Sequence, residues 1–173
     1  MKVAGVIAAL AVALVLQTTL AGLSMRSAGL VNLVLIAVVY VALAQGAVTG
    51  LLAGAAGGIV QDALAGAVIG VGGLTKTIVG FFVGVLGAQF IVSQPLPRFV
   101  MFVAATVVHE LCFQALSAVV ESRGFSLHYS TLVTQALING AIGLLAFQVI
   151  EGAPGLVQRR QMRRSSDLSR RRF

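Results

Sequence analysis

His109 and Glu110 are adjacent in the middle of an apolar segment, Phe99–Val120, where an imidazole and a carboxyl group could bind a metal or transfer a proton. In zinc proteases, a helix with the pattern His-Glu-x-x-His supplies two metal ligands and a carboxylate base. The second histidine would stand at position 113, which is Phe113 in this chain. The motif is therefore incomplete, and we expect no metal at this pair.

Glu110 needs a partner, because an ionised carboxyl at the centre of a membrane costs on the order of 3 kcal/mol. Asn139 lies at the middle of the last apolar segment and is a candidate partner, and Gln114 lies one helical turn beyond Glu110. No second acid is expected at that depth. We therefore favour an interhelical hydrogen bond over a polar functional site.

Asp62 and Lys76 form a second pair, with Asp62 closing one expected helix and Lys76 opening the next. Each stands at the helix end that its own charge disfavours. If the two helices are antiparallel neighbours, these ends lie at one depth, and a mutual ion pair explains both residues. Contact of both side chains with interfacial water explains them nearly as well, whereas an ion-coupling site is the less economical third reading.

Signatures of catalysis are missing from the chain. There is no Gly-x-Ser-x-Gly elbow, and the single cysteine, Cys112, has no activating neighbour and forms no internal disulfide. Gly66, Gly70, Gly72 and Gly73 make a glycine-rich connection, which we expect to be irregular, but they do not spell a phosphate-binding loop. We expect no catalytic residue, no cofactor and no enzymatic activity.

Membrane helices must carry these polar residues. The chain is 58% hydrophobic and 10% charged, whereas soluble domains carry about 25% charged residues. Apolar runs of about 18 or more residues indicate membrane-spanning helices. We predict an all-α, polytopic helical bundle over residues 1–152, with six transmembrane helices on the segments Val3–Leu23, Leu30–Ala44, Ala47–Val60, Leu74–Val92, Phe99–Val120 and Leu132–Ile150.

Two of these assignments have an alternative that must be weighed. The first, Val3–Leu23, is longer than the roughly 7–15-residue apolar core of a signal peptide, so we interpret it as a span. The stretch Leu30–Val60 carries no charge, is too long for one span and is short for two. The only plausible break is Gln45-Gly46, and we expect two short helices joined there by a very tight turn.

Basic residues set the orientation. The net charge is +7, and most of the bases lie in the tail, residues 153–173, which we expect to be disordered. Short basic flanks stay in the cytoplasm, and six spans place both termini on one side. We therefore expect both termini to be cytoplasmic, and we favour an orientation signal over nucleic-acid binding. The tail bases are Arg159, Arg160, Arg163, Arg164, Arg170, Arg171 and Arg172.

Glycines recur at every fourth position in the third and fourth expected helices. Small residues at this spacing let helices approach closely in lipid, where dispersion and weak hydrogen bonds must hold them together. We expect packing within the bundle rather than a specific dimer interface. The residues are Gly46, Gly50, Gly54 and Gly58 in one helix and Gly80, Gly84 and Ala88 in the next.

Several of these stretches resemble the rod shape-determining protein MreD family. The resemblance rests on residues 31–40, on 50–54, on 57–66 with the acid Asp62, on Ile69, Gly70 and Leu74, and on Asn139-Gly140. Departures from the family pattern are Val31 in place of a proline, the absence of tryptophan and the basic tail.

This resemblance implies a fold similar to the substrate-binding subunits of energy-coupling-factor transporters. It also implies a non-enzymatic assembly role in the cell-elongation complex of peptidoglycan synthesis, in the bacterial inner membrane. The implied partners are membrane lipid, MreC, MreB, RodA and a penicillin-binding transpeptidase.

The alternative function is a transporter subunit that binds a small solute. Such a protein needs convergent polar residues near the middle or the outer half of the membrane. This chain offers only a thin set for that purpose: Asp62, Lys76, His109, Glu110 and Asn139.

Overall fold

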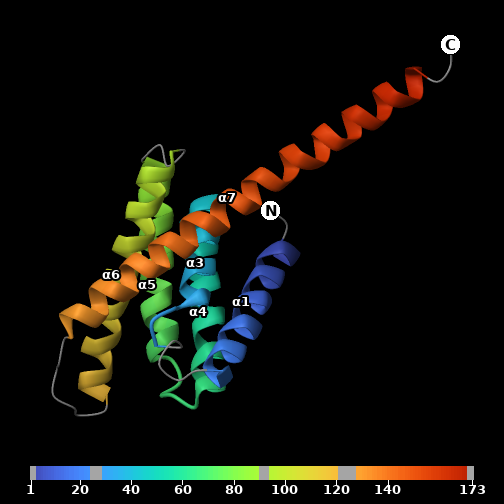
Figure 1. The fold of residues 1–173 in the computed structure, drawn as a ribbon. Helices are drawn as coiled ribbons and strands as arrows, with labels where there is room; N and C mark the ends of the chain where they lie inside the picture. The colour runs from blue at the N-terminus through green and yellow to red at the C-terminus, as the bar shows by residue number, and fades with distance from the viewer. Residues whose placement is uncertain (1–2, 24–28, 90–93, 121–127, 171–173) are drawn as a thin grey trace.

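The computed structural model describes residues 3–23, 29–89, 94–120 and 128–170, with the side chains of the last range described as far as residue 150. Within these ranges the fold is all-helical (Figure 1). The helices are α1 (Val3–Leu23), α3 (Leu33–Gln45), α4 (Ala47–Ala65), α5 (Val71–Gln89), α6 (Pro95–Val120) and α7 (Tyr129–Arg170).

The short helix α3 lies at the centre of the bundle and contacts each of the other described helices. A helix that is apolar all round belongs in such a position, because every face can be buried. Its residues separate into two core clusters. Leu35, Ile36 and Val39 pack with residues of α5, α6 and α7, while Val38 and Val41 pack with residues of α1 and α4.

The predicted tight turn is confirmed at Gly46, but only the first of the two helices is short, since α4 has 19 residues. This residue alone separates α3 from α4, and its φ of 89° lies in the region that favours glycine. Its backbone N–H donates to the carbonyl oxygen of Ala42 at 2.9 Å. The absence of a side chain therefore lets the chain reverse direction with a single non-helical residue.

Several predicted boundaries are wrong, since α4 ends at Ala65 and not at Val60, and α6 begins at Pro95 and not at Phe99. Helix α5 begins at Val71, so Gly72 and Gly73 are helical and do not belong to the irregular connection. Helix α7 continues to Arg170, whereas the last predicted segment ends at Ile150. The division at residue 152 and the disorder of the tail stay predictions.

Among the described helices, five are long and apolar enough to cross a membrane, as in a multi-pass membrane protein. Helix α3 has 13 residues, so it is about 20 Å long against a hydrocarbon thickness of about 30 Å. Large apolar side chains cover the outside of the bundle, including Val3, Leu52 and Val149. Apolar exposure of this kind is expected where a helix faces lipid.

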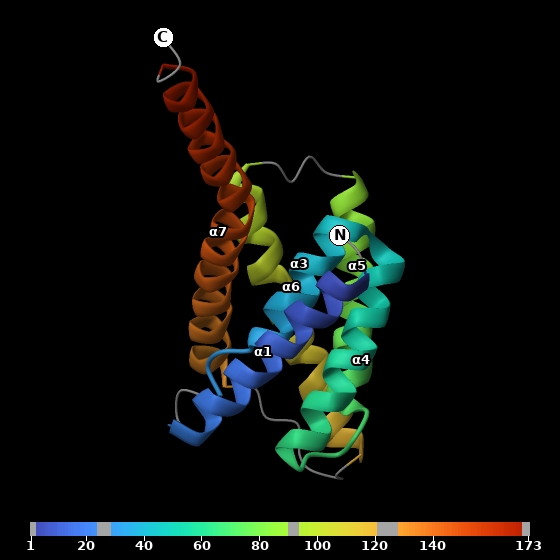
Figure 2. The ribbon, with the colours of Figure 1, turned by 90° about the vertical axis from the view of Figure 1, so that its right-hand side faces the viewer.

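Successive helices run in opposite directions along the bundle (Figures 1 and 2). The beginning of α1 and the end of α7 therefore lie at the same end of the molecule, which we call the terminal end. Helices α1, α4 and α6 finish at the other end, which we call the distal end.

Candidate functional site

Helices α4 and α5 meet backbone to backbone. A Cβ atom added to Gly58 would lie 2.5 Å from the Cα atom of Gly73, and one added to Gly50 would lie 2.5 Å from the carbonyl oxygen of Gly80. One added to Gly54 would overlap the carbonyl group of Lys76. No side chain fits at these positions, so glycine alone permits the approach.

The same contact continues towards the terminal end, where a Cβ atom on Gly84 would overlap the backbone of Ala47. All five candidate glycines therefore lie in one antiparallel helix pair. They are Gly50, Gly54 and Gly58 in α4, with Gly80 and Gly84 in α5.

Asp62 connects the distal end of α4 to the first turn of α5. Its Oδ2 atom accepts hydrogen bonds from the backbone N–H groups of Gly70, at 2.9 Å, and Gly73, at 3.1 Å. These N–H groups lie where a helix leaves its donors unpaired and where its dipole attracts an anion. Gly72 makes room for the carboxylate, because a Cβ atom there would overlap Oδ1 of Asp62. The acid at the end of α4 is thus a cap for α5.

Lys76 is 2% exposed and Asp62 is 5% exposed, so neither side chain extends freely to the surface of the bundle. Among the described residues, no direct ion pair joins them, which corrects both of the leading sequence-based explanations. The opposite charges of Asp62 and Glu110 nevertheless lie near enough to attract the ammonium group of Lys76.

Glu110 accepts a hydrogen bond from Nε2 of Gln114 at 2.9 Å, within its own helix. The neighbouring His109 is 3% exposed and stacks on Phe113 with ring centroids 5.9 Å apart. Neither ring nitrogen of His109 has a hydrogen-bond partner in the described part of the chain. Of the two candidate partners of Glu110, Gln114 is the one that contacts it, and the expected interhelical bond to Asn139 is wrong, although Nδ2 of Asn139 is left without a partner among the described residues.

Asn139, on α7, is fully buried and holds the start of α3. Its Oδ1 atom accepts from the backbone N–H of Asn32 at 3.1 Å, and Asn32 in turn caps α3 by accepting from the N–H of Leu35 at 3.0 Å. The unpaired N–H groups ahead of a helix need acceptors, and in lipid water does not supply them. This need directs Asn139 towards α3 and away from α6.

Gln17, the one amide in the first apolar segment, serves the same region and is absent from the sequence-based candidates. Its Nε2 atom donates to the carbonyl oxygen of Val31 at 3.0 Å, and its Oε1 atom accepts from the N–H of Leu33 at 2.7 Å. A lone amide in a membrane helix requires a partner, and this requirement is the sequence signal that identifies it. Gln17 attaches α1 to α3.

The buried polar residues thus have mainly local tasks at helix ends and between helices. In the described residues, no group of three or more His, Cys, Asp or Glu side chains is placed to hold a metal ion. An arrangement of caps and close glycine contacts holds helices in register.

Comparison with known families gives one result. The profile of the rod shape-determining protein MreD family matches residues 2–151, which is nearly the whole chain. No curated protein and no solved structure matches the chain significantly. The family match covers every membrane-embedded element described above. The chain therefore belongs to the rod shape-determining protein MreD family.

Proposed function

We propose that this chain acts in rod-shape determination as a non-enzymatic assembly protein of the cell-elongation complex. Membership of the family implies a role in rod shape, and the family is not a known enzyme family. On this proposal the bundle brings together the membrane proteins of peptidoglycan synthesis. The expected partners are MreC, MreB, RodA and a penicillin-binding transpeptidase.

One observation carries the proposal: Asp62, Asn139 and Gln17 each use their hydrogen bonds to hold a neighbouring helix of the same chain. In each of these three side chains an oxygen atom is engaged within the chain and is not free to bind a solute, although Nδ2 of Asn139 has no partner among the described residues. The outer faces of the helices are apolar instead. Apolar and small-residue helix faces are the surfaces through which membrane helices associate.

We propose that the chain crosses the bacterial inner membrane six times, with both termini in the cytoplasm. Helix α3 is surrounded by other helices, so its length need not match the lipid thickness. The positive-inside rule assigns the terminal end, with the basic tail, to the cytoplasm. A reporter that is active only outside the membrane should stay inactive when fused to Phe173, and strong activity would reject six crossings.

Glu110→Gln tests the assembly role. The glutamine keeps the carbonyl oxygen that accepts from Gln114 and removes the charge. We expect this variant to restore rod shape in cells depleted of the wild-type protein, as judged by the ratio of cell length to width. A proton-coupled or catalytic carboxylate would not tolerate the change. A variant that is stable and inserted at wild-type levels but leaves the cells round would reject the assembly role.

A further inference from the structure

A cavity lies between α1 and α4, lined by residues from the distal half of α1 and the distal end of α4. The two helices touch where the side chain of Leu10 packs over Gly57, with a Cβ atom on that glycine 3.1 Å from Leu10 Cδ2. Beyond this point the helices diverge, because Gln17 ties α1 to the start of α3 instead. The divergence leaves a cavity of about 420 Å³.

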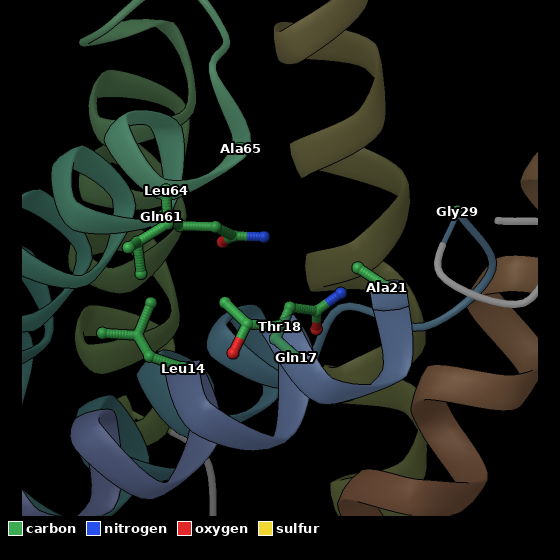
Figure 3. A pocket seen from close by; sticks show the side chains of 8 residues that line it. All are labelled: Leu14, Gln17, Thr18, Ala21, Gly29, Gln61, Leu64 and Ala65. Atoms are coloured by element: carbon green, nitrogen blue, oxygen red, sulfur yellow. The ribbon is translucent and has the colours of Figure 1, made fainter. Parts of the chain in front are cut away.

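Uncharged side chains line this cavity (Figure 3). The Gln61 side chain extends from α4 into the gap, with its amide nitrogen leading (Figure 3). Its amide makes no hydrogen bond with the described residues, and its Oε1 atom is buried without a partner. Leu14 and Leu64 form apolar walls, and Leu64 is 59% exposed at the outer surface of the bundle.

The depth of Gln61 identifies the chemistry of an occupant. Gln61 lies about one helical turn, or roughly 6 Å, from the end of α4. Helix α4 has 19 residues and is about 28 Å long, close to the hydrocarbon thickness of about 30 Å, so Gln61 lies just inside the boundary with the headgroups, where the ester groups of glycerolipids lie. An amide N–H there can donate to an ester carbonyl, while the acyl chain follows apolar side chains. The volume also lies within the range of about 300–1,000 Å³ that is usual for small-molecule sites.

We propose that this cavity binds one ester-linked glycerolipid, whose carbonyl oxygen accepts a hydrogen bond from Nε2 of Gln61 and whose acyl chain packs between Leu14 and Leu64. The bound lipid fills the space that α1 and α4 leave open and completes their contact. Nothing in this assignment depends on the role of the protein in cell shape.

The experiment compares two lipids with the same chains and headgroup, ester-linked dioleoyl phosphatidylglycerol and its ether-linked analogue, which has no carbonyl groups. Native mass spectrometry of the full-length purified protein measures the affinity of each. We expect one tightly bound ester lipid, with roughly a tenfold preference over the ether, because one hydrogen bond is lost. Gln61→Leu should abolish the preference.

Matched variants control for general effects. Gln89→Leu makes the same change at an exposed position outside the cavity and should keep the tenfold preference. Leu64→Trp should fill the cavity and remove the bound lipid, whereas Leu52→Trp, on the same helix and 60% exposed, should not. Equal affinity for the two lipids, or a preference that survives Gln61→Leu, would overturn the proposal. So would the absence of one-to-one lipid binding, the result expected of a cavity reserved for a partner helix.

Discussion

Helix α4 meets α5 and α1 in opposite ways. Against α5 its glycines lie on the partner backbone, with Gly50 against Gly80, Gly54 against Lys76 and Gly58 against Gly73. Against α1, Gly57 meets the side chain of Leu10, and Ala53 packs in one core cluster with Val6 and Leu10. Small residues therefore allow backbone contact with α5, whereas α1 meets α4 through its larger side chains.

Polar side chains reinforce this difference. At the distal end Asp62 on α4 accepts hydrogen bonds from the backbone at the start of α5, and these bonds extend the glycine contact between the two helices. At the same end Gln17 draws α1 towards α3 and away from α4. Asp62 thus holds α4 against α5, whereas Gln17 holds α1 away from α4. The closely packed centre of the bundle is therefore α3 with α4 and α5. Helix α1 is the less firmly packed element.

The largest expected effect comes from Gly54→Leu. A side chain at this position would overlap the backbone of Lys76, which cannot move without separating α4 from α5. We expect a loss of stability at or beyond the roughly 1–3 kcal/mol that overpacking usually costs. Thermal unfolding of the detergent-purified protein measures it. Gly22→Leu on α1 is the matched control, because a Cβ atom there meets nothing within 4 Å. Equal stability of the two variants would contradict the backbone contact.

Removal of the Asp62 cap should have the next largest effect. Asp62→Ala leaves the N–H groups of Gly70 and Gly73 unpaired and Lys76 with one fewer counter-charge, at a cost of about 1–3 kcal/mol. Asp62→Asn keeps an acceptor oxygen and should lose less. Combining Asp62→Lys with Lys76→Asp should not restore stability, because an ammonium group cannot accept those bonds. Recovery in that double variant would indicate a direct ion pair instead.

Gln17→Leu should have a smaller effect, confined to one side of the bundle. It removes two hydrogen bonds between α1 and the start of α3, at a cost of about 1–2 kcal/mol. Hydrogen exchange should become faster at the amide of Leu33 and stay unchanged in α5. Thr18→Val is the control, since the Thr18 hydroxyl donates only within its own helix, to Val15. Unchanged exchange at Leu33 after Gln17→Leu would show that the amide does not hold α1 in place.

Residue pattern was sufficient for the periodic features of this protein. Apolar runs predict the helices, because in lipid only a helix pairs all its backbone groups locally. The charge-free stretch around Gly46 predicts the tight turn, since the length excludes one span and glycine tolerates the reversal. The four-residue spacing of Gly50, Gly54 and Gly58 predicts that one face of α4 is open to a close neighbour. The family match over residues 2–151 agrees with the resemblance inferred from the glycine and apolar positions.

Tertiary structure alone decided which groups the polar side chains contact. Asp62 bonds to the backbone of α5, and Asn139 bonds to the start of α3, although charge and depth suggested Lys76 and Glu110. Spacing fixes which face of a helix a residue occupies, but not the rotation and depth of the neighbouring helix. Backbone N–H groups are also present at every helix start, whatever the side chains. The sequence therefore does not show which helix start a polar side chain will pair with. Only the packed bundle shows which acid or amide reaches each unpaired backbone donor.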